Sequence, residues 1–147
     1  MFGGEGLVAL EEEESDLKVV ASRETQLLAR SLQKAFRNAL RDRQLEEVAD
    51  TLAALAAVEP TVAIFVYDEE GQVVATSKGA QPSRATESLA ARGSSSQTPI
   101  VEFDPEDAPT RLRLAIRLRS EKEGRSSAIV LERPLNELHR DLAASRR

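Results

Sequence analysis

The spacing of apolar residues changes at Pro60. Before this proline, an Ala/Leu-rich and highly charged stretch has apolar residues every three or four positions, as in an amphipathic helix. After it, Val62–Tyr67 and Gln72–Ser77 are rich in β-branched residues and are joined by the short turn Asp-Glu-Glu-Gly, a pattern typical of a β-hairpin. A long helix that leads directly into a hairpin restricts the chain to folds that mix α and β structure.

The helical stretch contains two apolar rows that are out of phase, one over Leu17–Leu40 and one over Leu45–Ala56. The change of phase predicts a kink or a break near Arg41–Gln44 and a second helix that ends before Pro60. The alternative is one continuous helix whose buried face rotates along its length. The acidic run Glu11–Glu14 is suited to a first helical turn, where the helix dipole favours negative charge.

Three more strands and two short helices are predicted downstream. A Gly/Ser/Pro-rich connection after the hairpin contains a helical segment at Arg84–Ala91, and strand patterns follow at Pro99–Asp104, Thr110–Arg119 and Ser127–Glu132. Pro134 is expected to open a last helix, because proline is favoured at the first helical position. The predicted fold class is α+β: a five-stranded, mostly antiparallel sheet with the long N-terminal helix on one face and a C-terminal exit helix.

These elements predict one domain. Residues 1–15 are expected to form a flexible N-terminal segment, and the chain then enters through helices over 16–59, builds the sheet over 62–132 and leaves through the exit helix at 134–147. Matched periodicity in the helices and strands predicts ten core residues. They are Leu28, Leu32, Phe36, Leu52, Ile64, Val66, Val74, Leu114, Ile116 and Ile129.

The charge distribution excludes several classes of function. The net charge of −5 equals that of the first twenty residues, which carry six acidic residues against Lys18 alone. The rest of the chain is neutral and lacks the basic surface of a nucleic-acid-binding domain. There is no cysteine, so neither a disulfide nor a thiolate metal site can form. The sequence has no signal peptide and no apolar run of about 20 residues. If this domain belongs to a membrane protein, we therefore expect the chain to be a piece excised from that protein.

Residues suited to catalysis are sparse. The single histidine, His139, has no nucleophile beside it and is expected to be an ordinary surface residue. Asp104, Glu106 and Asp107 lack the spacing of a calcium-binding loop. The sequence therefore predicts a non-enzymatic domain without a cofactor or a metal.

One face of the predicted strand Thr110–Arg119 carries a row of arginines: Arg111, Arg113, Arg117 and Arg119. On a solvent-facing strand they would pair across the sheet with Glu102, Asp104 or Glu132. Alternatively they bind an anion, since guanidinium groups contact carboxylates and phosphates with two parallel hydrogen bonds. The number of nearby acidic residues favours pairing.

Val20 and Leu27 lie off the main apolar row of the first helix. Seven residues apart, they predict a seam through which two copies of the helix pair in parallel to form a homodimer. The alternative is that they are scattered apolar residues on an ordinary surface.

The hairpin V-A-I-F-V-Y-D-E-E-G-Q-V-V-A-T-S, the helix before it and the closing segment A-I-V-L-E-R-P-L-N-E-L resemble the extracytoplasmic sensor domains of bacterial histidine kinases. These domains have the PAS-like fold called PDC. The resemblance covers roughly Asp16 to Arg147. It implies a sensor on the periplasmic side of the inner membrane, between two membrane helices that this chain lacks. Such a sensor belongs to a dimeric two-component receptor, whose kinase activity lies outside this chain.

In that family a small ligand lies against the sheet, under the connection after the second strand. The resemblance therefore implies a small-molecule ligand. Members that bind carboxylates use basic and hydroxyl residues, so for an anion the nearest candidates are Tyr67, Ser77, Lys78, Arg113 and Arg117. The conformational signal would pass from the sheet to the membrane through the terminal helices.

A roadblock- or profilin-like scaffolding domain, which acts by protein–protein interaction, is the alternative. Its order of helices and strands is similar, and its hairpin carries a similar turn. Such domains have a shorter first helix and a longer helix after the second strand. This chain shows the reverse, which favours the sensor.

Overall fold

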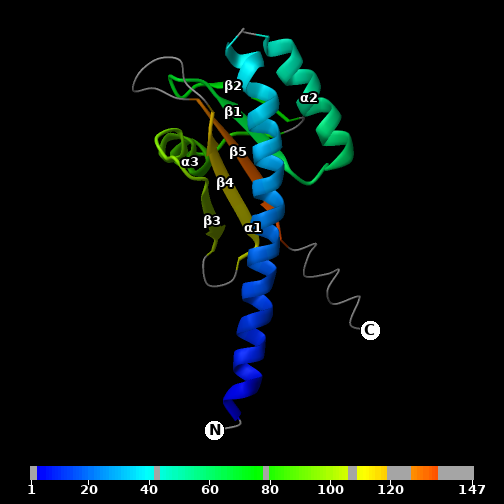
Figure 1. The fold of residues 1–147 in the computed structure, drawn as a ribbon, viewed down its shortest axis with the longest axis vertical. Helices are drawn as coiled ribbons and strands as arrows, with labels where there is room; N and C mark the ends of the chain where they lie inside the picture. Colours follow the sequence, from blue (N-terminus) through cyan, green and yellow to red (C-terminus); the bar gives the residue numbers. More distant parts are fainter. Residues whose placement is uncertain (1–2, 42–43, 78–79, 106–108, 119–126, 136–147) are drawn as a thin grey trace.

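The computed structural model describes residues 3–41, 44–77, 80–105, 109–118 and 127–135 (Figure 1). The order of elements is the one predicted as far as the fifth strand. The elements are α1 (Gly3–Arg41), α2 (Leu45–Val58), β1 (Ala63–Tyr67), β2 (Val73–Thr76), α3 (Arg84–Ser94), β3 (Ile100–Asp104), β4 (Arg111–Arg117) and β5 (Ala128–Pro134).

The five strands form one sheet in the order β2-β1-β5-β4-β3, and every neighbouring pair is antiparallel. The last strand in sequence, β5, therefore lies at the centre, between β1 and β4. These features confirm the predicted α+β class and the five-stranded antiparallel sheet.

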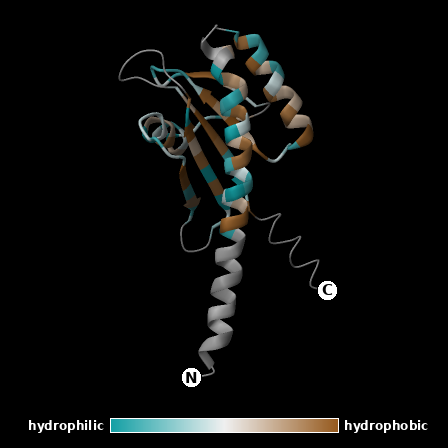
Figure 2. Ribbon diagram, viewed as in Figure 1, coloured by the Kyte–Doolittle hydropathy of each residue, from teal (hydrophilic) through white to brown (hydrophobic). Residues whose placement is uncertain are grey.

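The larger core lies between the sheet and the two first helices. Figure 2 shows mainly hydrophobic strands behind α1, and Phe36 from α1 and Leu52 from α2 are both buried against Ile64 and Ile129 of the sheet. All ten residues predicted for the core belong to it. Leu28 and Val74 are only partly buried, and the other eight are buried.

The opposite face of the sheet is covered by α3. Leu89 and Ala90 of this helix pack with Phe65, Tyr67 and Val130 of the strands in a smaller second core. The helix begins at a capping box, in which the Ser83 side chain accepts a hydrogen bond from the Thr86 backbone and the Thr86 side chain accepts one from the Ser83 backbone. The Gly/Ser/Pro-rich connection therefore carries a helix that closes this face.

Near the end of α3, the helix backbone lies directly against β4. A Cβ atom placed on Gly93 would lie 2.6 Å from the Cβ of Ala115, closer than two carbon atoms can approach. The strand β4 is thus covered on both faces, and Arg113 and Ala115 are both buried. The expectation of a strand with one solvent-facing side is wrong at these two positions, because α3 covers them.

The predicted break between the first two helices is confirmed: α1 ends at Arg41 and α2 begins at Leu45. The predicted start of the first helix is wrong, because α1 begins at Gly3 rather than at the acidic run near position 11. The predicted hairpin turn is also confirmed. Gly71 has a φ of 82°, and the Asp68 carboxylate accepts hydrogen bonds from two backbone N–H groups of the turn.

The end of the sheet differs from the prediction. Pro134 is the last residue of β5 and lies opposite Arg111 of β4, so it does not open a helix. Leu135 is buried, and its N–H donates to the Thr110 carbonyl at 2.9 Å. Pairing with β4 keeps the chain extended here. Because β1 pairs with β5 only as far as Glu132, Pro134 has one neighbouring strand, as in an edge strand, where proline is tolerated. The rest of the predicted exit helix, with His139, lies outside the described residues, as do Glu106 and Asp107.

The two ends of the described chain lie at the same end of the sheet. The first half of α1 projects beyond the sheet, at the end toward which β5 runs (Figure 1). Near the end of β5, the Arg133 Nη1 atom lies 3.1 Å from the Glu24 Oε2 atom in α1. Within the described ranges, none of the helices has the length and apolarity needed to cross a bilayer.

Candidate functional site

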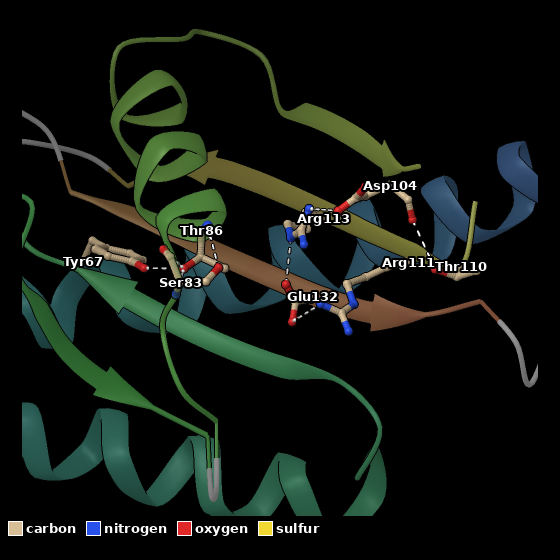
Figure 3. A network of polar contacts seen from close by, with 8 residues as sticks. All are labelled: Tyr67, Ser83, Thr86, Asp104, Thr110, Arg111, Arg113 and Glu132. Atoms are coloured by element: carbon tan, nitrogen blue, oxygen red, sulfur yellow. Dashed lines mark hydrogen bonds and ion pairs between the residues drawn. The ribbon is translucent and has the colours of Figure 1, made fainter. Parts of the chain in front are cut away.

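Figure 3 shows the sheet from the α3 side, with two groups of polar side chains on this face. The first group is centred on Arg113 of β4. Its Nε donates to Glu132 Oε2 of β5 at 2.7 Å, and its Nη1 donates to Asp104 Oδ2 of β3 at 3.0 Å. Arg111 Nη1 lies 3.7 Å from the other oxygen of Glu132. One buried guanidinium therefore joins three adjacent strands.

Arg113 is nearly inaccessible, with 8% of its side chain exposed. Burial disfavours the charged guanidinium, but the hydrogen bonds and charges of Glu132 and Asp104 outweigh this effect and raise the pKa of Arg113 above its ordinary value. The side chain is therefore charged at every working pH. Pairing across the sheet, the favoured interpretation of the arginine row, is confirmed at this position.

The third predicted acidic partner, Glu102, is bound from the helix. Arg92 of α3 donates to its carboxylate across the edge of the sheet. Charged contacts thus hold α3 to β3, and β3 to the centre of the sheet. This face is held together by ion pairs at the β3 side and by apolar packing at the β1 side.

The second polar group fixes the start of α3. The Tyr67 hydroxyl donates to Thr86 Oγ1 at 3.0 Å, and Thr86 Oγ1 donates in turn to the Ser83 carbonyl at 2.9 Å. Tyr67 is 1% exposed. Its ring lies in the second core, so this chain of hydrogen bonds ties the capping box of α3 to β1 (Figure 3).

Burial raises the pKa of Tyr67 above its ordinary value of 10.0, and the negative charges of Glu87 and Glu132 act in the same direction. Because the folded-state pKa is raised, the stabilising contribution of the protonated phenol is complete below about pH 10 and is lost as the pH rises toward the folded-state pKa.

We therefore expect the free energy of unfolding to fall above pH 10, and to fall less steeply in Tyr67→Phe. Tyr67 is the only tyrosine in the chain, so the ultraviolet absorbance of its phenolate reports its ionisation directly. Titration at or below the ordinary pKa in the folded protein would contradict the burial described above.

The candidate ligand residues do not converge on one cavity. Tyr67 lines a hollow of about 310 Å³ beside the hairpin turn, whereas Arg113 lines a groove of about 690 Å³ along the edge strand β3. Ser77 is buried beyond the end of β2 and accepts a hydrogen bond from the Ile64 N–H at 2.9 Å. Arg117 is exposed at the end of β4, and Lys78 lies outside the described residues.

The groove beside β3 is lined by charges of both signs, whereas the four charged residues that line the hollow are all acidic. Lys18 of α1 reaches its rim, with its ammonium 5.5 Å from the centre of the Phe103 ring. Val101 and Phe103 form an apolar wall, while Asp104 and Arg113 form a charged one. Lys18 and Arg113 thus line the groove together with Glu102 and Asp104, so its lining carries two charges of each sign.

The end of β5 is held on both faces of the sheet. Glu132 points toward the α3 side and binds Arg113, while the next residue, Arg133, binds Glu24 of α1 on the other side. Successive strand residues face opposite sides, so one dipeptide links both layers. A shift of α1 or of the Arg113 cluster would therefore move the end of β5, where the chain leaves the sheet.

Two of these features were not predicted from the sequence. The start of α3 at Arg84 agrees with the predicted segment Arg84–Ala91, but its cap was not identified, although serine is a favoured residue directly before a helix. The contact between Glu24 and Arg133 joins residues far apart in the chain, and no local pattern marks it.

Among the described residues, no group of three or more His, Cys, Asp and Glu side chains could hold a metal ion. No family model matches the sequence, and no curated protein matches it.

Proposed function

We propose that this chain is the extracytoplasmic, ligand-sensing domain of a membrane-bound bacterial histidine kinase, with a PAS-like fold of the PDC type. It would lie on the periplasmic side of the inner membrane and pass a conformational signal to a kinase outside this chain. The observation that carries the proposal is that α1 projects from the same end of the sheet toward which β5 runs. A domain held between two membrane helices needs both of its connections at one end.

The strand order supports the same function. Because β5 is the central strand and the last one, any change in the sheet acts on the segment that leaves it. The contacts of Glu132 with Arg113 and of Arg133 with Glu24 give both layers a direct connection to that segment. Small shifts of packed elements are one of the ways in which proteins switch between states.

The proposed ligand is a small anion, for which Tyr67, Ser77, Lys78, Arg113 and Arg117 remain the candidates from the sequence. Since Arg113 already binds two carboxylates, we place the ligand at the part of the groove beside β3 that Lys18 lines next to Phe103. A carboxylate at 100 times its dissociation constant should stabilise the fold by about 2.7 kcal/mol, and Lys18→Gln should weaken this effect. A screen of small anions in which none raises the melting temperature would remove this part of the proposal.

A roadblock- or profilin-like scaffold is the second candidate, because it shares the order of helices and strands. The relative helix lengths favour the sensor. Here the first helix has 39 residues and the helix after the second strand has 11, the opposite of what such scaffolds have.

The side of the inner membrane on which the domain lies distinguishes the sensor from the scaffold. The chain has no cysteine, so Gln97→Cys, at an exposed position in the connection after α3, creates one reporter. It would be introduced into the full-length protein after any other cysteines have been removed. We expect a membrane-impermeant maleimide to label it in cells whose outer membrane alone is permeable. Labelling that requires lysis of the inner membrane would place the domain in the cytoplasm and overturn the proposal.

A further inference from the structure

We propose that the row of α1 that bears Val20 and Leu27 pairs with the same row of a second copy in antiparallel orientation. We call this row the α1 seam and define it by heptad spacing as positions 13, 20, 27 and 34. The inference concerns the separated chain in solution and does not depend on the proposed function.

From Val20 to Lys34 the seam faces away from the sheet. Val20 is 47% and Leu27 is 65% exposed, and Lys34 is exposed one heptad further on. The residues of α1 that pack on the sheet, such as Ala29 and Phe36, lie on the opposite side of the helix. Because α1 is continuous from Gly3, position 13 belongs to the same row, one heptad before Val20.

The charges at the two ends of the seam are opposite. Position 13 is a glutamate and position 34 is a lysine. In an antiparallel pair centred between Val20 and Leu27, each valine meets the leucine of the second copy, and each Glu13 lies opposite Lys34. In a parallel pair, Glu13 would lie opposite Glu13 and Lys34 opposite Lys34. Like charges that face each other in a helix pair select against that orientation.

The rest of α1 follows the same charge gradient. Before position 17 every charged residue of the helix is acidic, and from there to its end Glu24 is the only acidic residue. Arg23, which is exposed beside the seam, would lie near Glu24 of an antiparallel copy but near Arg23 of a parallel one. Charge complementarity thus selects the antiparallel copy as the partner, rather than the parallel copy expected from the apolar residues alone.

This arrangement has a consequence for the proposed receptor. Two copies anchored in one membrane can approach only in parallel, and the seam then sets like charges opposite each other. In the receptor the seam would hold the two first helices apart, and contacts that bring receptors together would have to lie elsewhere. Because two apolar side chains supply little buried area, the antiparallel pair should be weak and sensitive to salt.

Charge reversal in the full 147-residue chain tests the orientation. We expect Glu13→Lys alone, and Lys34→Glu alone, to raise the dimer dissociation constant roughly tenfold at low salt, since two pairs change from attraction to repulsion. The double variant should restore it. Sedimentation equilibrium over a range of concentrations gives these values. In a parallel pair, neither single reversal would weaken association, because like charges would still face each other.

Cross-linking provides a second readout on the same chain. A mixture of Val20→Cys and Leu27→Cys proteins should form the mixed disulfide faster than either variant forms a disulfide with itself. Faster homodisulfides would show a parallel pair, and a strict monomer at the highest attainable concentration would show that the seam does not pair. Either result overturns the inference, and neither bears on the sidedness of the domain.

Discussion

Replacing Arg113 with methionine should lower the free energy of unfolding by about 2–4 kcal/mol. Methionine keeps most of the length of the side chain but leaves the Glu132 carboxylate, which is only 20% exposed, without its guanidinium partner. Breaking a buried ion pair from one side costs about 3–5 kcal/mol, and the partial exposure of Glu132 and the greater exposure of Asp104 reduce that value. Urea denaturation at an unchanged m-value measures the loss.

Arg117→Met provides the matched control, because it makes the same change on the same strand at an exposed position. It should cost less than about 1 kcal/mol. Adding Glu132→Gln to Arg113→Met should cost much less than Glu132→Gln does alone, because the two side chains act on each other. Equal costs for Arg113→Met and Arg117→Met would mean that the cluster does not stabilise the sheet.

Gly93→Val should be equally damaging, with a loss of about 3 kcal/mol or more. A single Cβ at this position already lies 2.6 Å from that of Ala115, so a branched side chain must push α3 away from β4. Overpacking of a well-filled core costs about 1–3 kcal/mol for small additions, and valine adds more than one methyl group. The same denaturation measurement applies, with lowered protection of α3 amides from hydrogen exchange as a local readout.

Ala91→Val is the control on the exposed side of the same helix, where only helix propensity changes, by about 0.7 kcal/mol or less. Gly93→Ala combined with Ala115→Gly moves one methyl group from the strand to the helix and should recover much of the loss caused by Gly93→Ala alone. If Gly93→Val were tolerated as well as Ala91→Val, α3 would not lie as close to the sheet as described.

Periodicity predicted most of the fold because most of the elements are defined locally. The phase change between Leu40 and Leu45 located the break between α1 and α2, and the Asp-Glu-Glu-Gly turn located the hairpin. Pro134 was misread because proline fits both a helix start and a strand end. Pairing with Arg111, which is distant in sequence, decides between them.

The candidate site was predicted less completely, for a similar reason. Alternating arginines and leucines on β4 suggest a strand with one solvent-exposed face. Only the packing of α3 shows that Arg113 is buried. One residue did carry a signal. Ala115 interrupts the arginine row at the position where Gly93 of α3 meets the strand. A small residue within a charged row marks the close approach of another element.

The proposed transfer of a signal through the end of β5 can be tested with Arg133→Ala in the full-length protein. This substitution removes the contact with Glu24 of α1 and should change autophosphorylation in membrane vesicles severalfold, as Glu24→Ala should. A Gly/Ser linker inserted after Leu135 provides the decisive comparison, because Leu135 is the last buried residue of the described chain and the sheet before it stays intact.

With the linker in place, we expect autophosphorylation to be the same with and without Arg133→Ala, since motion of β5 can no longer reach the segment that leaves the domain. Circular dichroism of the isolated domain should show that each variant remains folded. Signal transfer through β5 would be contradicted if Arg133→Ala left autophosphorylation unchanged without the linker, or if its effect persisted with the linker present.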